Sequence, residues 1–323
     1  MYPSLLFTVS SLALTALTAV ADTNSSRPLA LVYRGDSACK GCSEAVAKLL
    51  EGSPQNFAVT YVGPKEDTQI SAETLSKAAA YAQPGGPDQT QAFRELEGHG
   101  PELRDFINNG GRYFGFCLGA YLAGPNEGFG FLPPGVNAVN ERKSENAQVT
   151  STDNAVIQIN WNFRSKTNRF SAQATDTQWL FFQDGAAIEG LSDNSTVLGR
   201  YAQNGDVAAS LTPLGKGWVA LVGPHPEATS GWFQSVDQPG GSKENGVTFD
   251  IGYDFVNTAM SAGPVPDGRN TTNTNGGTGT TGRTGRTGKA GRPGRNGRRP
   301  GSSSPEDKDE SRWGNDDDNE DEE

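Results

Sequence analysis

Residues 112–124 read RYFGFCLGAYLAG and join a β-rich run to a helix-like run through one cysteine, Cys117. Glycine stands two positions away on each side of the thiol, at Gly115 and Gly119. A strand that turns sharply into a helix between small residues is the elbow that exposes a nucleophile at the edge of a sheet. The start of a helix also favours a negative charge, and hence the thiolate. The stretch therefore predicts a reactive cysteine, with a small buried core residue as the alternative interpretation.

The segments on either side predict an α/β fold with a mainly parallel sheet flanked by helices, because strand-like and helix-like runs alternate. The expected strands are 29–35, 57–63 and 112–116, and the expected helices are 43–50, 72–82 and 92–111. After residue 130 the chain is β-rich, with expected strands at 155–163, 177–183, 197–202, 207–211 and 218–223, a tight turn at 215–217 and a closing helix at 250–260. Aromatic residues on these strands, among them Phe181, are expected in the core.

A thiolate nucleophile also needs a base and donors for the developing oxyanion. His225 follows an apolar strand, and sites in parallel sheets lie at the carboxyl ends of strands, so His225 is expected beside Cys117. Glu227 is placed to orient the imidazole. The expected oxyanion donors are the N–H groups of Leu118 and of Gly86 in the turn QPGG. The other histidine, His99, lies in a helix break and is interpreted as a solvated loop residue.

Three of these motifs, GFCLGAYLAG (115–124), QPGG (83–86) and HPE (225–227), together resemble the class I glutamine amidotransferases. That resemblance implies a flavodoxin-like fold and a Cys-His-Glu triad. In this chain the triad would be Cys117, His225 and Glu227. The chain departs from the pattern at Pro224, where glutamine amidotransferases usually have an aromatic residue.

A second set of motifs is more specific: YRGDSACKGCSEAVAKLL (33–50), GGRYFGFCLGAYLAG (110–124) and GPHPE (223–227). These resemble the amino-terminal domain of fungal biotin–protein ligases, which has secreted stand-alone relatives. The resemblance covers roughly residues 29–230. Because no ligase segment accompanies the domain, we expect no biotin-ligase activity.

Two classes of function follow from these residues. The first is a cysteine-dependent amidase or γ-glutamyl hydrolase, which cleaves a carbon–nitrogen bond of a small-molecule or peptide carboxamide without a cofactor. The alternative is a non-catalytic binding module that uses the same pocket. No metal is expected, because structural zinc needs about four Cys or His ligands and the chain has three Cys and two His.

Cys39 and Cys42 form a Cys-Lys-Gly-Cys pair at the start of a helix-like run. A structural disulfide is the favoured interpretation, and a redox site is the alternative. A redox role would make thiol–disulfide exchange a third function for the chain. The pattern Asn-x-Ser/Thr predicts glycosylation at three positions, Asn24, Asn194 and Asn270.

The two ends of the chain differ in composition from the middle. Residues 1–21 are apolar and end in Ala-Val-Ala, which predicts a signal peptide and a secreted protein, extracellular or in the cell wall. The glutamine amidotransferase-like domain is expected over 22–261. Residues 262–323 are expected to form a disordered tail, first rich in Gly and Arg and then acidic. Stable membrane insertion is not expected.

The net charge of −11 conceals a strong division along the chain. Residues 306–323 carry eleven acidic and two basic side chains, and residues 265–305 carry eight basic and one acidic. The rest of the chain therefore carries −9. An acidic domain argues against nucleic acid as a partner, since phosphates need a basic surface. The basic part of the tail is expected to contact cell-wall polyanions weakly and in a salt-dependent way.

Overall fold

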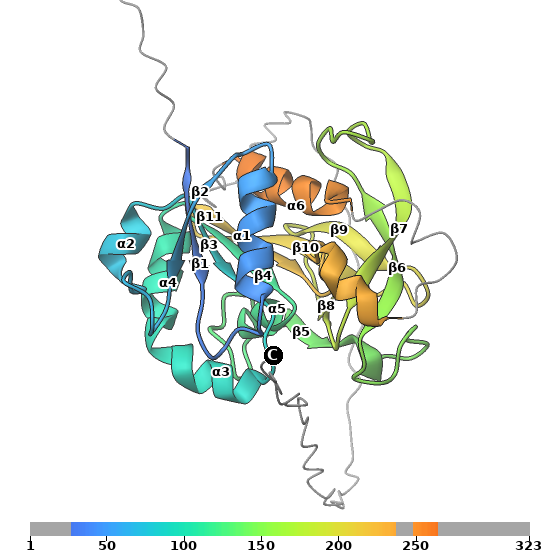
Figure 1. Ribbon diagram of the computed structural model, residues 1–323, viewed down its shortest axis with the longest axis horizontal. Helices are drawn as coiled ribbons and strands as arrows, with labels where there is room; N and C mark the ends of the chain where they lie inside the picture. The colour runs from blue at the N-terminus through green and yellow to red at the C-terminus, as the bar shows by residue number, and fades with distance from the viewer. Residues whose placement is uncertain (1–26, 237–247, 264–323) are drawn as a thin grey trace, which may run out of the picture.

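The computed structural model describes residues 27–236 and 248–263 (Figure 1). The elements before residue 123 are β1 (Leu29–Tyr33), α1 (Cys42–Gly52), β2 (Ala58–Val62), α2 (Ala72–Ser76), β3 (Ala80–Gln83), α3 (Gln89–Leu96), η1 (Glu97–His99), α4 (Gly100–Asn108), β4 (Arg112–Phe116) and α5 (Leu118–Leu122). Those after it are β5 (Asn137–Asn140), η2 (Glu141–Lys143), β6 (Ala155–Asn162), β7 (Thr175–Phe182), β8 (Ala186–Glu189), β9 (Thr196–Tyr201), β10 (Val207–Leu214), β11 (Gly217–Val222), η3 (Ser230–Ser235) and α6 (Asp250–Ser261).

A nine-stranded sheet runs through the molecule in the order β2-β1-β3-β4-β11-β10-β9-β6-β7. Its first five strands are parallel, and the strands from β10 onward add an antiparallel extension. A second sheet pairs β5 with β8. The predicted α/β class, with a parallel sheet flanked by helices, is confirmed.

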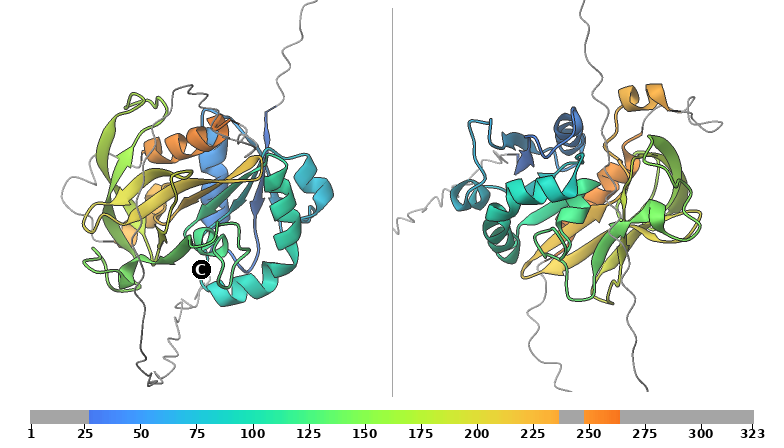
Figure 2. Two further views of the ribbon diagram at one scale, coloured as in Figure 1. Left: turned by 180° about the vertical axis from the view of Figure 1, so that it is seen from behind. Right: turned by 90° about the horizontal axis from the view of Figure 1, so that it is seen from below.

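Helices cover both faces of the parallel half, and each face has its own apolar core. Side chains of α1 and α6 pack in one core, and side chains of α2, α3, α4 and α5 pack in the other. Figure 1 looks onto α1 and α6, and the reversed view in Figure 2 looks onto α3 and α4. The central parallel strands β1, β3, β4 and β11 are mostly buried between the two layers of helices, so the ends of these strands are left for chemistry.

The prediction of one helix over 72–82 is wrong in its second half. Helix α2 ends at Ser76, and Ala80–Gln83 forms β3, a central strand between β1 and β4. All four residues of β3 are buried. A strand covered on both faces shows no alternation of polar and apolar residues, so the sequence carries no strand signal here. The alanines of this segment favour a helix by their intrinsic propensity, which explains the wrong prediction. The helix predicted over 92–111 is likewise two helices, α3 and α4, joined by η1.

Strand β11 brings the second half of the chain back into the parallel sheet. The predicted tight turn is present: Gly215 has a φ of 60°, and β10 and β11 pair antiparallel across it. Strand β11 then runs parallel to β4, with Val222 opposite Phe116. Because both strands end at the same edge, Cys117 and the loop that holds His225 leave the sheet side by side.

Several predictions lie outside the described residues: the signal peptide, the tail beyond Gly263, and the sequons at Asn24 and Asn270. Asn194 is described and exposed, in the connection between β8 and β9. Over residues 27–236 and 248–263, none of the helices combines the length and the apolar character that crossing a bilayer requires.

Candidate active site

Cys117 sits between β4 and α5 in a strained backbone conformation, with φ 47° and ψ −105°. A positive φ is rare for a residue with a side chain and is maintained only where the surroundings impose it. Here the Cys117 N–H donates to the Val222 carbonyl at 2.9 Å. Side chains at Gly115 and Gly119 would overlap the carbonyl oxygens of Gly119 and Gln83. The tight turn therefore requires glycine on both sides of the thiol.

The loop after β11 supplies a buried histidine–carboxylate pair. His225 Nδ1 lies 2.8 Å from Glu227 Oε1, and the two side chains are 4% and 0% exposed. The His225 N–H donates to the Phe181 carbonyl at 2.9 Å, which fixes the backbone of this loop. The carboxylate can thus hold the imidazole in one orientation, as the sequence predicts.

The thiol and the imidazole meet beside Gly85. A Cβ atom placed on Gly85 would lie 2.8 Å from His225 Cε1 and 3.5 Å from Cys117 Cβ. Both groups therefore border the same small space, and Gly85 keeps that space open. The Cys117 sulfur also lies 3.5 Å from the Gln183 carbonyl oxygen.

The charge state of His225 follows from two opposing effects. Burial alone would lower the pKa of His225, because a low dielectric disfavours the imidazolium. The negative charges of Glu227 and Cys117 outweigh burial and raise the pKa of His225 to about 10. The histidine is therefore a cation at neutral pH. A cation beside a cysteine in general favours the thiolate form of the thiol.

The two predicted oxyanion donors, Gly86 and Leu118, line one cavity with Cys117, of about 510 Å³. Leu118 is the first residue of α5, so its N–H has no acceptor within the helix. The Gly86 N–H donates to no other described residue. A side chain at Gly86 would overlap Leu118 and the Ser37 carbonyl, so the position admits only glycine.

The opposite wall of this cavity was missed by sequence reasoning. Asp184 has a φ of 47°, and its Oδ1 accepts from Asn140 Nδ2 and Arg142 Nε, each at 2.7 Å. The Tyr121 hydroxyl donates to the Asp184 carbonyl at 3.0 Å. These four residues come from three separate segments of the chain, and the only local signal was the Asp184-Gly185 turn dipeptide. The wall is polar and carries both signs of charge, which suits a small polar ligand.

Aromatic rings cover the imidazole. The ring centroids of Phe181 and Trp232 lie 5.9 Å and 5.2 Å from that of His225. Phe181 is buried, as predicted, but it packs against the candidate site rather than only against other core residues. This cover keeps water from the imidazole, which strengthens its interaction with Glu227.

His99 lies in η1, away from this cavity, and its side chain is 38% exposed. It has a carboxylate neighbour that the sequence analysis did not foresee, because Glu102 Oε2 lies 3.6 Å from His99 Nδ1. The pair spans the start of α4 at a spacing of three residues and faces solvent. Its exposure agrees with the interpretation of His99 as a solvated residue.

Cys39 and Cys42 are joined by a disulfide, with their Cα atoms 5.3 Å apart, and Cys117 is a buried free thiol. The bridge closes the turn that precedes α1, and Cys42 is the first residue of that helix. The favoured interpretation of this pair, a disulfide, agrees with the structure.

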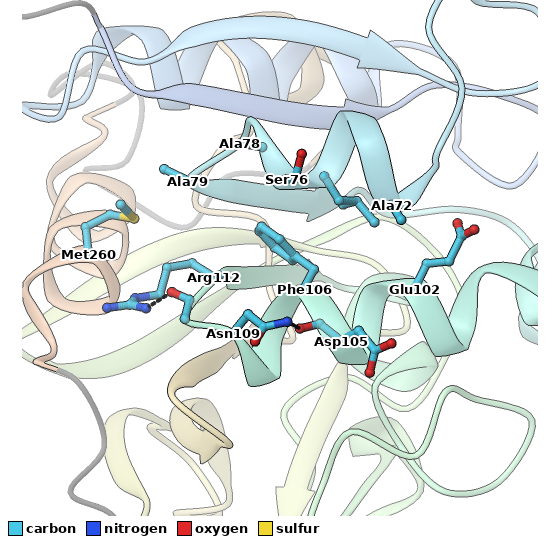
Figure 3. Close-up of a pocket in the computed structure, with 13 residues that line it drawn as sticks. Ala72, Ser76, Ala78, Ala79, Glu102, Asp105, Phe106, Asn109, Arg112 and Met260 are labelled. Carbon is cyan, nitrogen blue, oxygen red and sulfur yellow. Dashed lines mark hydrogen bonds between the residues drawn. The ribbon is translucent and has the colours of Figure 1, made fainter.

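A second cavity, of about 550 Å³, lies near the amino-terminal end of β4 (Figure 3). Its walls include Phe106, Arg112 and Met260, and none of the predicted site residues. The Arg112 guanidinium there donates to the carbonyls of Ala259 and Ala262, at 2.8 and 2.7 Å. It serves to cap the end of α6. The cavity beside Cys117 is therefore the better candidate, because it alone of the two is lined by a thiol, and that thiol has His225 packed beside it.

Residues 29–249 match the family described as Biotin-protein ligase, N terminal. No curated protein matches the chain. Among solved structures, the chain is similar to PurLQS from Thermotoga maritima, at 16% identity and a TM-score of 0.47, over 72% of this chain and 99% of that one. It is also similar to a crystal structure of glutamine amidotransferase, at 17% identity and a TM-score of 0.43, over 61% of this chain and 90% of that one.

The family match begins at the first residue of β1 and ends just before α6. It thus includes the Cys117 elbow, the Gly85-Gly86 turn and the His225 loop, and it covers more than half of the whole chain. This chain belongs to the biotin-protein ligase N-terminal family.

Proposed function

We propose that the protein is a cysteine-dependent hydrolase of carbon–nitrogen amide bonds, acting on a carboxamide or a γ-glutamyl amide. The observation that carries the proposal is that one strained thiol, Cys117, lines a polar cavity and packs beside the same glycine, Gly85, as the imidazole of the buried His225–Glu227 pair. A cation held between a sulfur and a carboxylate is the arrangement that activates a thiol nucleophile.

In the proposed mechanism the Cys117 thiolate attacks the carbonyl carbon of the substrate, and the C=O electron pair moves to oxygen. The oxyanion accepts hydrogen bonds from the N–H groups of Gly86 and Leu118. The His225 imidazolium then gives its proton to the departing nitrogen, so that ammonia or an amine leaves and a thioester remains. Water attacks the thioester carbonyl while His225 takes one of its protons. The tetrahedral intermediate then collapses to the carboxylic acid and the Cys117 thiolate, which restores the starting thiolate and imidazolium.

The second candidate function is capture of a ligand without turnover. Cys117 is only 7% exposed, and a family can keep an elbow whose thiol no longer reacts. In that case the cavity would bind a small polar ligand through the charged wall around Asp184. Alkylation of Cys117 would then affect binding only by steric blocking.

The proposal extends to location, with support from the sequence alone. The apolar residues 1–21 support secretion, and the basic segment of the tail supports tethering to cell-wall polyanions. Amino-terminal sequencing of the protein recovered from culture medium tests the first point. A start at Asp22 is expected, and retention of Met1 would contradict it.

The test of the mechanism measures how fast iodoacetamide alkylates Cys117 as the pH is varied. His225→Ala is expected to slow alkylation at pH 7 by about a hundredfold, because the thiolate loses its cation. His99→Ala is the matched control, since it removes the other histidine of the chain, and its rate is expected to stay within about twofold of wild type. Equal rates in all three proteins would contradict an activated nucleophile.

Turnover is tested on a panel of glutamine amides and γ-glutamyl anilides. Activity of the wild type that disappears in Cys117→Ala supports the hydrolase. Activity that survives the substitution rules out Cys117 as the nucleophile. Saturable binding without product release, in a protein with an unreactive thiol, would favour the binding module.

A further inference from the structure

The Cys39–Cys42 disulfide lies against the candidate active site. A Cβ atom on Gly85 would lie 3.6 Å from Cys42 Sγ and 3.5 Å from Cys117 Cβ. The bridge and the nucleophile are thus packed against the same glycine, although they are 75 residues apart in the sequence. No feature of the proposed mechanism uses this contact.

The disulfide also attaches the Gly85 turn to a rigid helix. Cys42 is fully buried and is the first residue of the eleven-residue α1, whose apolar side packs in the core. The bridge ties Cys39 to that residue, and the Cys39 N–H donates to the Gly85 carbonyl at 2.9 Å. The Gly85 carbonyl is therefore linked to α1 through the disulfide, and also through the hydrogen bond from the Cys42 N–H to the Cys39 carbonyl at 3.1 Å.

That hydrogen bond fixes the direction of the next N–H. Gly85 and Gly86 share one planar trans peptide, in which the carbonyl and the N–H point in opposite directions. Because the carbonyl points to Cys39, the Gly86 N–H points away from it, and Gly86 lies in the wall of the cavity that holds Cys117. The Ser37 carbonyl and the Leu118 side chain confine Gly86 further.

We propose that the Cys39–Cys42 disulfide is a positioning element for the oxyanion donor Gly86, so that reducing it weakens stabilisation of the tetrahedral intermediate while leaving the nucleophile intact. This inference rests on the proposed hydrolase function. The two cysteines touch no reacting atom. They act through the peptide that joins Gly85 to Gly86, and the state of the bridge then sets the rate of the enzyme.

The thiol–imidazole pair and the oxyanion donor are held by different parts of the fold, so opening the disulfide is expected to affect only the donor. His225 is fixed by Glu227 and by the backbone of Phe181, and Cys117 by Val222. Those contacts do not involve the disulfide. In the described residues, the Gly85 carbonyl accepts a backbone hydrogen bond from Cys39. Opening the bridge therefore loosens one donor and spares the thiol–imidazole pair.

The experiment uses the full-length protein and two reagents that need different parts of the site. The aldehyde N-acetyl-glutamate γ-semialdehyde, labelled with ¹³C, adds to Cys117 as a thiohemiacetal whose oxyanion needs the donors. Iodoacetamide reacts with the thiolate and needs no oxyanion donor. The affinity for the aldehyde and the rate of alkylation of Cys117 are measured before and after reduction with a phosphine. The same two quantities are measured in the variant Cys39→Ser/Cys42→Ala. Lys40→Ala, an exposed position inside the disulfide loop, is the control.

Reduction and the double variant are each expected to weaken the aldehyde affinity by about tenfold to a hundredfold, as expected for a misplaced oxyanion donor. The alkylation rate is expected to stay within about twofold of wild type, and reoxidation is expected to restore the affinity. Lys40→Ala should change neither quantity. Amide hydrogen exchange gives a readout independent of chemistry: the Cys39 N–H should lose its protection in the reduced protein.

Two results would overturn the inference while leaving the proposed function standing. One is an aldehyde affinity that reduction does not change. The other is a parallel fall of affinity and alkylation rate, which would mean that the bridge supports the fold in general. A wild-type protein that forms no thiohemiacetal at all would contradict the proposed function and this inference together.

Discussion

Two histidine–glutamate pairs of this molecule can be compared directly. His225 and Glu227 lie 2.8 Å apart and are 4% and 0% exposed, whereas His99 and Glu102 lie 3.6 Å apart and are 38% and 39% exposed. The residue types are the same, and both pairs are close in sequence. The buried pair holds His225 as a cation, with a pKa well above the ordinary value. Water screens the charges of the exposed pair, so their interaction is weaker. The comparison indicates that burial, more than residue type, decides how strongly the two charges of such a pair interact.

The largest expected difference between the two pairs is the loss of activity when the carboxylate of each pair is replaced in turn by a neutral amide. Glu227→Gln should lower the proposed hydrolase activity by about 10³-fold, because the imidazolium loses its partner and its fixed orientation. Glu102→Gln should leave activity unchanged and alter the free energy of unfolding by less than about 0.5 kcal/mol. Steady-state kinetics and urea denaturation measure the two quantities. Equal losses of activity in both variants would remove the distinction.

The next effect is on stability as a function of pH. The pKa of His225 is raised to about 10 in the folded protein from an ordinary value of 6.5. A raised pKa contributes stability that is fully present below pH 6.5 and is lost as the pH rises toward 10. The loss should amount to at most about 5 kcal/mol, since one pKa unit corresponds to about 1.4 kcal/mol. Urea denaturation of the wild type and of His225→Ala between pH 6 and 10 measures it, and curves that run parallel would contradict the assignment.

The smallest expected difference in activity between the two pairs comes from adding one methyl group beside each histidine in turn. In Gly85→Ala the new Cβ would lie 2.8 Å from His225 Cε1, so the imidazole must shift, and activity should fall by about tenfold. Gly98→Ala adds the same group next to His99, where nothing lies within 4 Å of it. That variant should keep full activity and be slightly more stable. A Gly85→Ala enzyme with wild-type kcat would mean that the imidazole has room to move.

Local sequence was sufficient for one wall of the candidate site. The elbow at Cys117, the first residue of α5 and the His225-Pro226-Glu227 loop were all predicted in place, since each depends on a few consecutive residues. The β3 segment was misread as helix, because a fully buried strand carries no periodic signal. The Asp184 wall was not predicted at all, since Tyr121, Asn140 and Arg142 reach it from segments that share no local pattern.

The sequence by itself determined the kinds of group available: one free thiol beside a disulfide pair, two histidines, and glycines where the backbone must turn. These choices depend on steric rules that act over a few residues. Only the tertiary structure decided how deeply His225 and Glu227 are buried, and which glycine the Cys39–Cys42 bridge supports. Burial and charge interactions depend on contacts between distant segments, and those contacts exist only once the sheet has brought β3, β4 and β11 together.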